Sequence, residues 1–214
     1  MTYLILERLI VGPLGTNSYI FGSDKKVVII DIGGDPDIII NTIEKLDLEP
    51  IAILLTHGHY DHTLKVGKIL RYFNIPLMFN KKEFDFGIFT HKTADKWLSE
   101  GDSMEIGAIT LHVLETPGHS PGALSYYSKD LKEFEGRQID GVVFTGDLIF
   151  RGSIGRSDLR GGDPHLLFSS IKTKIMYNPE ITDNFLICPG HMGITYVGEE
   201  RNLNMFRHYF LDEN

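Results

Sequence analysis

Four apolar runs in this chain each end in a sharp turn that carries a histidine or an aspartate. Continuous runs of β-branched residues and leucine, bounded by turns, are typical of strands buried on both faces of a sheet. In open sheets, ligands and catalytic groups gather beyond the strand ends, where loops converge on one crevice. The repetition therefore predicts a single shared site. The runs and their turns are 51–55 with 56–62, 109–114 with 116–120, 141–144 with 145–147, and 185–188 with 189–191.

The first of these turns is the densest, with the sequence Thr-His-Gly-His-Tyr-Asp-His. Neutral imidazole nitrogens and carboxylate oxygens are ligands that zinc, iron and manganese accept. Gly58 lets the backbone curl, so that His57 and His59 can face one metal ion while Asp61 and His62 face a second. The turn therefore predicts a metal site with room for two ions.

Each of the other three turns adds one candidate ligand. His119 lies in a Thr-Pro-Gly-His-Ser turn, Asp147 in a Thr-Gly-Asp turn, and His191 in a Pro-Gly-His turn. A single loop histidine is more often structural than a ligand. Seven such residues at four strand ends are hard to explain by chance, so the set favours metal binding.

Composition and charge limit the class of protein. With 214 residues, 42% of them hydrophobic and 23% charged, we expect one globular domain over residues 1–214. The net charge of −8 argues against a nucleic-acid partner, because such proteins carry a basic stripe. Glu7 and Arg8 interrupt the apolar amino terminus, so we expect no signal peptide or membrane span and a cytoplasmic protein. The single cysteine, Cys188, excludes an internal disulfide and is expected to be buried.

The remaining sequence alternates between strand and helix patterns. Short β-rich runs separated by Gly and Asp turns predict three amino-terminal strands, and caps with helical spacing predict four helices. Elements in this order favour two sheets packed face to face with helices outside. The expected strands are 3–11, 17–21 and 26–30, and the expected helices are 38–46, 64–73, a segment from 162–164 through 175, and 199–210.

In this order, the motifs resemble those of the metallo-β-lactamase superfamily and, within it, the glyoxalase II-like hydrolases, also described as hydroxyacylglutathione hydrolase-like. The resemblance runs from about Asn17 to about Asn204 and rests on highly specific motifs. It implies an α+β fold, a four-layer αββα sandwich of two mixed sheets with the site at one edge. The motifs are His-x-His-x-Asp-His at 57–62, Thr-Pro-Gly-His-Ser at 116–120, Thr-Gly-Asp at 145–147 with 155–158, and Pro-Gly-His at 189–191 with 197–202.

The resemblance also implies how the ligands are divided. One divalent ion would be bound by His57, His59 and His119, the other by Asp61, His62 and His191, and Asp147 would bridge them. Zinc is the first expectation, with iron or manganese as alternatives. A water between two such ions has its pKa lowered from 15.7 to about 7, so a bridging hydroxide can act as the nucleophile, with Asp61 and Asp147 as its catalytic partners.

The implied substrate is a small-molecule thioester such as S-lactoylglutathione. Glyoxalase II binds glutathione with an added carboxy-terminal helical region. This sequence ends at Asn214, so we expect most of that binding region to be absent. Arg156 and Arg201 are candidate partners for a substrate carboxylate, although a solvated surface charge explains each equally well. The residues after His62 also depart from the family, which has a small residue and a glycine where this chain has Thr63-Leu64-Lys65.

Other functions stay open at this point. A mononuclear iron enzyme resembling the persulfide dioxygenases of the same superfamily would use His57, His119 and Asp147. His191 favours the hydrolase, because it completes a second metal site. A phosphodiesterase and a non-catalytic metal-binding protein rank below both, and the oligomeric state is not predicted.

Five further residues have competing interpretations. Asp31 either accepts a hydrogen bond from a ligand histidine or simply forms a turn. His91 lies in the aromatic segment 84–97, which could fold over the site as a lid, although packing is the favoured explanation. The other three histidines are expected to be structural: His112, His165 and His208.

Overall fold

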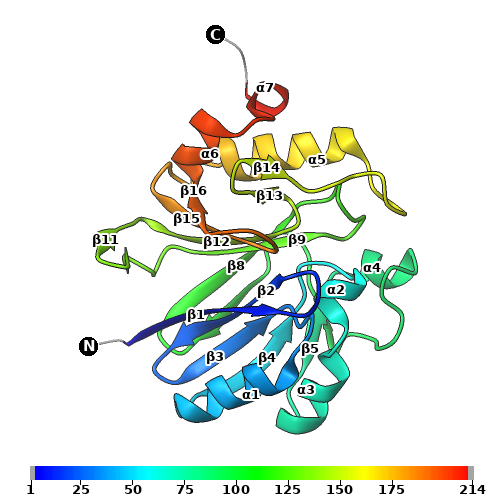
Figure 1. The fold of residues 1–214 in the computed structure, drawn as a ribbon, viewed down its shortest axis with the longest axis vertical. Coiled ribbons are helices and arrows are strands. Elements are labelled where there is room, and N and C mark those ends of the chain that lie inside the picture. Colours follow the sequence, from blue (N-terminus) through cyan, green and yellow to red (C-terminus); the bar gives the residue numbers. More distant parts are fainter. Residues whose placement is uncertain (1–2, 212–214) are drawn as a thin grey trace.

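The computed structural model describes residues 3–211, and its first six-stranded sheet is built from the amino-terminal part of the chain (Figure 1). The strands follow one another in space in the order β1-β2-β3-β4-β5-β6. The first three are antiparallel, and β3 to β6 are parallel. The bounds are β1 Leu4–Val11, β2 Thr16–Ser23, β3 Lys26–Ile30, β4 Glu49–Leu54, β5 Leu77–Phe79 and β6 Lys96–Trp97.

A second six-stranded sheet comes from the later part of the chain, in the order β16-β15-β12-β9-β8-β7. All its pairs are antiparallel except β12 with β15, so this sheet is mixed as well. The bounds are β7 Ser103–Ile106, β8 Ile109–Glu115, β9 Leu124–Ser128, β12 Gly141–Gly146, β15 Phe185–Pro189 and β16 Thr195–Tyr196; two short hairpins add β10 Glu133–Phe134 with β11 Arg137–Gln138, and β13 Ile149–Phe150 with β14 Ser153–Ile154.

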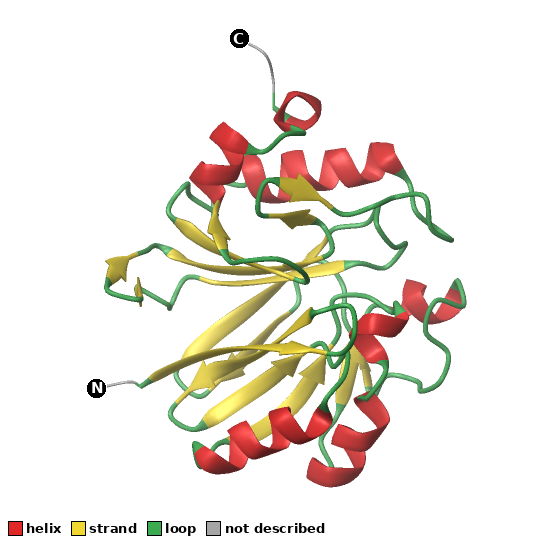
Figure 2. Cartoon of the chain, viewed as in Figure 1, coloured by secondary structure: helices red, strands yellow, loops and turns green. Residues whose placement is uncertain are grey.

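Helices cover the outer face of each sheet, so the molecule has four layers (Figure 2). Helices α1 Pro36–Lys45 and α3 Val66–Phe73 lie below the first sheet, and the helices of the last third lie above the second sheet. The latter are α5 Pro164–Ser170, the π-helix η1 Ile171–Met176, α6 Val197–Leu203 and α7 Arg207–Phe210; two short helices, α2 Tyr60–Thr63 and α4 Lys81–Asp85, lie beyond the strand ends.

Three separate apolar cores match the three boundaries between these layers. The central core packs the inward faces of both sheets together and includes Phe21 and Phe144, whose ring centroids are 5.0 Å apart. A second core joins the first sheet to α1 and α3, and a third joins the second sheet to the helices above it. The inner strands β2, β3, β9, β12 and β15 are therefore buried on both faces along nearly all their length. The unbroken apolar runs predicted this for β12 and β15, whereas β8 alternates between buried and partly exposed residues. The expected four-layer αββα sandwich is confirmed.

The two sheets are also tied by hydrogen bonds at the edge where their strands end. Thr56, just after β4, accepts from the Leu124 amide at 2.7 Å, and the Asn17 amide donates to the Gly190 carbonyl at 2.7 Å. The buried Tyr126 hydroxyl donates to the Leu55 carbonyl at 2.6 Å. These bonds bring the turns of one sheet against the turns of the other, so that residues far apart in sequence meet at one edge.

Two expected helices differ from those observed. The segment expected as one helix over 199–210 is two, because the chain leaves the helix at Asn204, whose buried side chain bonds the Ser153 carbonyl at 2.9 Å and Glu200 at 2.7 Å. The helix that begins at Asp163 changes to π-helix after Ser170. The first departure is set by tertiary contacts of Asn204, which helical spacing does not record.

No helix within residues 3–211 is long and apolar enough to cross a membrane. Cys188 is fully buried, as expected for a small hydrophobic residue.

Candidate metal centre

All seven candidate ligands lie at the edge where the strand ends meet. Four come from the first sheet, where β4 runs into the turn at 56–59 and then into α2, which carries Asp61 and His62. The other three come from the second sheet: His119 follows β8, Asp147 follows β12, and His191 follows β15. The sequence predicted this convergence, and the structure brings the side chains into three overlapping groups whose ligand atoms lie within 4.8 Å of one another.

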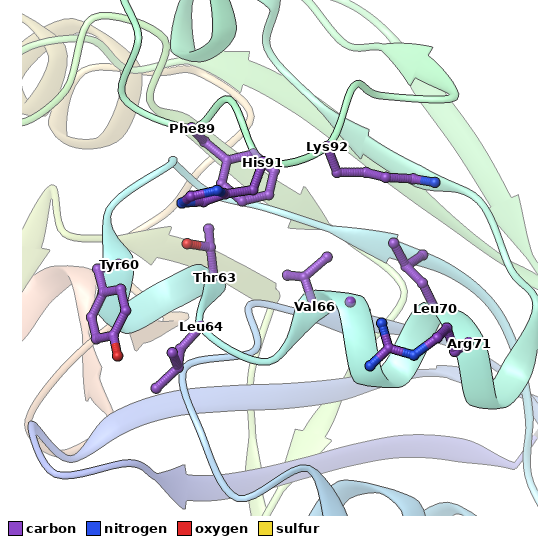
Figure 3. Close-up of a pocket in the computed structure, with 10 residues that line it drawn as sticks. Tyr60, Thr63, Leu64, Val66, Leu70, Arg71, Phe89, His91 and Lys92 are labelled. Atoms are coloured by element: carbon purple, nitrogen blue, oxygen red, sulfur yellow. The ribbon is translucent and has the colours of Figure 1, made fainter.

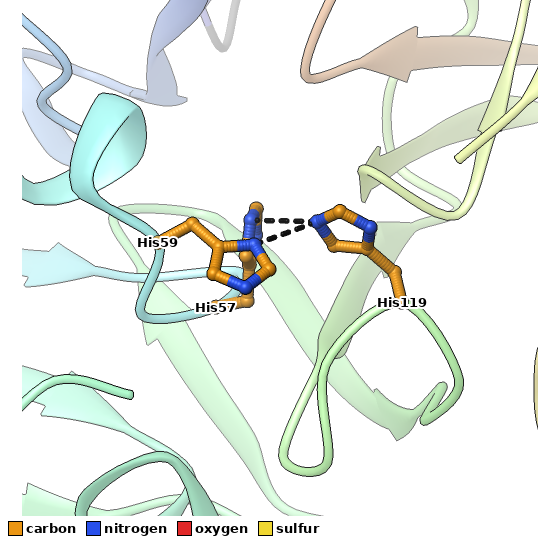
Figure 4. Close-up of side chains that lie close together, drawn as sticks. All are labelled: His57, His59 and His119. Atoms are coloured by element: carbon orange, nitrogen blue, oxygen red, sulfur yellow. Dashed lines mark hydrogen bonds between the residues drawn. The ribbon is translucent and has the colours of Figure 1, made fainter. Parts of the chain in front are cut away.

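The first group is made of three imidazoles (Figure 4). His119 Nε2 lies 2.8 Å from His59 Nδ1 and 3.2 Å from His57 Nε2. Two ligand nitrogens on one tetrahedral zinc ion are about 3.3 Å apart, given Zn–N distances of about 2.0–2.1 Å. The three rings therefore converge at nearly the spacing that a single metal ion requires.

The second group combines two imidazoles and a carboxylate. His191 Nε2 lies 3.1 Å from Asp61 Oδ2 and 3.4 Å from His62 Nε2. His62 Nε2 is 3.5 Å from Asp61 Oδ2, so the three atoms form a nearly equilateral triangle. Mixed nitrogen and oxygen donors in this arrangement suit zinc, iron or manganese.

Asp147 lies between the two groups. Its Oδ2 is 3.6 Å from His119 Nε2 of the first group and 3.5 Å from His191 Nε2 of the second. Its Oδ1 is buried and 3.2 Å from His62 Nε2, yet it has no hydrogen-bond partner among residues 3–211. A buried carboxylate oxygen without a donor is costly, and this one fits a bound cation. The donor set and this orphaned oxygen together match a two-metal centre.

Contacts behind the rings fix which nitrogen of each faces the site. The Thr56 hydroxyl donates a hydrogen bond to Asp31 Oδ2 at 2.7 Å, so Thr56 Oγ1 can only accept from His57 Nδ1, 3.0 Å away. His119 Nδ1 donates to the backbone carbonyl of Arg156 at 2.6 Å. Both rings therefore turn an unprotonated Nε2 toward the other ligands.

Asp31 supports the second group in the same way. Its Oδ2 lies 2.8 Å from His62 Nδ1, and its Oδ1 accepts from the Thr56 amide at 2.8 Å. Asp31 is buried and has a left-handed backbone with φ of 59°, which is strained for a residue other than glycine. Of the two interpretations, the hydrogen bond to a candidate ligand is the one observed.

Sequence patterns did not single out the residues that hold the His191 turn. Asn17 Nδ2 donates to the carbonyls of Pro189 at 2.8 Å and Met192 at 3.0 Å, and the buried Tyr19 hydroxyl donates to the Pro189 carbonyl at 2.8 Å. Both lie on β2, in the other sheet. The available signal was that the polar side chains of Asn17 and Tyr19 fall within the expected strand 17–21, every residue of which is buried.

Burial and neighbouring charges prepare these side chains for a cation. Burial lowers the pKa of His57 well below its usual range and the pKa of His59 to about 4, so both rings are neutral near pH 7. Burial also opposes charge on His62, but the carboxylates of Asp147 and Asp31 outweigh it and raise the pKa of His62 well above its usual value. The site therefore attracts positive charge.

The two arginines expected at the substrate have other partners. Arg156 forms a bidentate ion pair with Asp158, both bonds 2.7 Å long, and lies near the centre through its backbone carbonyl. Arg201 donates to Asp183 at 2.8 Å and to the Met176 carbonyl at 2.6 Å. Of the histidines expected to be structural, His112 stacks on Tyr127 with ring centroids 4.9 Å apart.

A cavity of about 410 Å³ lies between α2, α3 and the segment 89–92 (Figure 3). Phe89 is buried against Phe79, so part of the aromatic segment packs on the first sheet. His91 is exposed and lines the cavity, and its ring packs edge-on against Phe89 with ring centroids 6.1 Å apart. The lining residues include three basic side chains and no acidic one: Tyr60, Thr63, Leu64, Val66, Gly67, Leu70, Arg71, Phe89, His91 and Lys92.

Comparison with known proteins agrees with this geometry. The family model of the metallo-beta-lactamase superfamily matches residues 11–191. A probable metallo-hydrolase of Bacillus subtilis, YqgX, is 36% identical over 95% of this chain and 98% of its own length. The hydroxyacylglutathione hydrolase GloC of Haemophilus influenzae is 32% identical over 88% of this chain and 91% of its own length.

Two solved structures are similar along nearly their whole length. The B3 metallo-beta-lactamase BLEG-1 superposes with a TM-score of 0.84 at 37% identity, covering 95% of this chain and all of that one (100%). TTHA1623, solved in a di-iron-bound form, superposes with a TM-score of 0.78 at 31% identity, covering 94% of this chain and 99% of that one.

Proposed function

The chain belongs to the metallo-beta-lactamase superfamily, and on that premise we propose that it is a hydrolase that binds two divalent metal ions and cleaves a small-molecule thioester. The observation that carries the two-metal proposal is the second group, in which Asp61, His62 and His191 converge beside the three-histidine group. A one-metal enzyme would require only one such group, so a second complete set of ligand atoms supports a second ion.

We assign the ligands by their positions. The first ion would be held by His57, His59 and His119, and the second by Asp61, His62 and His191, a set that the distances favour. Asp147 would bridge them, because its oxygens reach members of both groups. Zinc is our first proposal for the occupant, and iron is the alternative, because a relative is known in a di-iron-bound form.

The protein's own residues would prepare the reaction. Two bound cations supply an acidified water and polarise the substrate carbonyl. Thr56, Asp31 and the Arg156 carbonyl keep the imidazole rings oriented, so these rings would hold the cations in a defined arrangement. Asp61 Oδ2 and Asp147 Oδ2 lie 3.1 and 3.5 Å from His191 Nε2, and either carboxylate could accept a hydrogen bond from a water there and orient it toward the carbonyl.

The substrate class is supported by a relative and by the cavity. GloC, named as a hydroxyacylglutathione hydrolase, shares most of its length with this chain. The cavity begins one residue from the ligands, since Tyr60 lies between His59 and Asp61, and Thr63 donates to the His59 carbonyl at 3.0 Å. Within residues 3–211, Arg71 and Lys92 form no ion pair, so both are available to an anion.

We propose that this cavity receives the non-reacting, carboxylate-bearing end of the thioester. Replacing Arg71 and Lys92 together by glutamine would then raise KM for an anionic thioester about tenfold or more while kcat stays within twofold, because the lost contacts serve binding in both ground and transition states. Lys65→Gln, an exposed lysine outside the cavity, is the matched control and is expected to change neither constant. An unchanged KM in the double variant would contradict this role.

The remaining parts of the proposal concern the setting of the enzyme. We propose that residues 1–214 act as one domain in the cytoplasm, on a small molecule and without a nucleic-acid or membrane partner. The net charge of −8 supports the absence of a nucleic-acid partner, because a polyanion would be repelled.

One experiment tests the function as a whole. The protein is purified without added metal, its metals per chain are counted, and S-lactoylglutathione and glutathione persulfide are offered in parallel. About two metals per chain with release of the free thiol from the thioester is the expected result. One iron per chain with oxygen consumption on the persulfide, and no thioester cleavage, would replace our proposal with a dioxygenase that uses His57, His119 and Asp147.

A further inference from the structure

A buried carboxylate lies between the two loops that carry the three-histidine group. Glu83, on helix α4, has no exposed surface. Its Oε2 accepts from the Gly58 amide at 2.8 Å, and its Oε1 accepts from the Gly122 amide at 2.6 Å and from the Ser120 hydroxyl. Both carboxylate oxygens are therefore satisfied, each by a different loop.

The positions of these donors matter because of their neighbours in sequence. Gly58 lies between His57 and His59, and Ser120 directly follows His119. We propose that Glu83 is a positioning residue that locks the His57–His59 turn to the His119 turn and so sets the geometry of the first metal-binding group. This rests on the two-metal arrangement proposed above, and it concerns metal affinity rather than the choice of substrate.

Both loops approach Glu83 too closely for any side chain. A methyl group added at Gly58 would lie 2.9 Å from Glu83 Oε2 and 2.7 Å from Phe89 Cβ. A methyl group added at Gly122 would lie 2.8 Å from the backbone nitrogen of Glu83 and 3.0 Å from Glu83 Cγ. The two glycines thus let the backbone of each loop close on the same carboxylate, which is a second, steric indication that Glu83 organises this place.

Hydrogen bonds to a buried carboxylate are stronger than neutral ones, and losing one leaves a buried amide unsatisfied. The second metal-binding group is held differently, by Asp31 behind His62 and by Asn17 behind the His191 turn. A change at Glu83 should therefore weaken the first group selectively.

The test uses Glu83→Gln, which keeps the size of the side chain. A glutamine presents one acceptor oxygen and one donor amide, so one loop amide, of Gly58 or Gly122, must face another donor. We expect about two metals per chain in the unaltered protein, and in Glu83→Gln a loss of 10–100-fold in affinity at one site only. Chelator competition with Zn²⁺ gives both dissociation constants, and the absorption bands of the Co²⁺-loaded protein report the altered three-histidine environment.

Glu200→Gln is the matched control. Glu200 is also buried and accepts from the Gly152 amide at 2.8 Å, the Thr195 hydroxyl at 2.7 Å and the Asn204 amide at 2.7 Å. Its replacement is expected to lower thermal stability to a similar degree while leaving both metal affinities and the Co²⁺ spectrum unchanged. This separates positioning from a general loss of stability.

Ser120→Ala removes one of the three bonds and serves if Glu83→Gln does not fold; it is expected to weaken the same site by a smaller factor. The inference is overturned if Glu83→Gln keeps both affinities, or if Glu83→Gln and Glu200→Gln weaken both sites alike. Because metal binding is read directly, two metals without thioester cleavage in the unaltered protein would refute the proposed function and leave this test intact.

Discussion

At the scale of single residues, Asp147 differs from Asp61 in its position between the two groups of candidate ligands. Its Oδ2 reaches both ligand groups, whereas Asp61 contacts only His62 and His191 among the candidate ligands. We predict that Asp147→Ala lowers the affinity of both metals, while Asp61→Ala lowers mainly that of the second. Metal content after dialysis, measured per chain, distinguishes the two variants.

The two aspartates serve as each other's control, since both changes remove one carboxylate from the same cluster. If Asp61→Ala retained two metals and full activity, the assignment of Asp61 as a ligand of the second metal would be wrong. If Asp147→Ala lost only one metal, the bridging role would be wrong.

Gly190 provides a second prediction at this scale. A methyl group there would lie 2.3 Å from Asp147 Oδ1 and 2.7 Å from His62 Cε1. Gly190→Ala should therefore push the two ligands apart and reduce metal content to less than half, because the cluster has no room to adjust without moving backbone. The far-ultraviolet circular dichroism spectrum should be retained, since the turn lies outside the sheets.

The same turn supplies the control for this change. A methyl group at Gly193 would meet nothing closer than the Arg151 side chain at 3.6 Å. Gly193→Ala is expected to keep its metals, and equal metal loss in both variants would show that the turn, rather than the cluster, is sensitive.

At the scale of elements, helix α3 contains a glycine that costs stability. Gly67 is exposed in the first turn of α3, and a methyl group there would meet only Arg71 Nη1, at 3.5 Å. Because glycine loses more conformational freedom than alanine when a helix forms, Gly67→Ala should raise the free energy of unfolding by about 0.5–1 kcal/mol. Urea denaturation measures this, and a destabilised variant would show that the helix needs the glycine for packing.

The elements also show where sequence patterns are sufficient. The four apolar runs correspond to β4, β8, β12 and β15. Continuous hydrophobicity was sufficient to identify β12 and β15, which are buried on both faces, whereas β8 is half-buried. The helix expected over 199–210 was wrong, because the buried amide of Asn204 bonds β14 and Glu200 and ends α6 early. Periodicity records which face is apolar, whereas it does not record a polar side chain that bonds outside its own helix.

At the scale of the whole molecule, neither sheet holds a complete site. The first sheet supplies His57, His59, Asp61 and His62, and the second supplies the other three candidate ligands. Metal ions bound between them would therefore act as cross-links between two halves of the fold. Only the folded protein has this site, so bound metal must add to stability.

We predict that a chelator lowers the melting temperature by on the order of 10 °C. At free metal a thousandfold above Kd, binding adds about 4 kcal/mol, and 1 kcal/mol shifts a chain of this size by roughly 2–4 °C. Differential scanning calorimetry with and without chelator measures the shift, and re-adding zinc should restore it. Glu200→Gln should show the same chelator effect as the unaltered protein, and no shift in either would show that the cluster does not bind metal.

The sequence by itself determined the class of fold and which residues could bind metal, because buried strands, sharp turns and metal-binding side chains have local signatures. Only the tertiary structure decided the distances between the candidate ligands, that Asp147 Oδ1 has no hydrogen-bond partner among residues 3–211, and that Asp31, Asn17 and Glu83 bond the loops that carry the ligands. The physical reason is distance along the chain: these contacts join residues separated by 25 to 172 positions. Such contacts depend on how two sheets are packed together, and no local pattern encodes that packing.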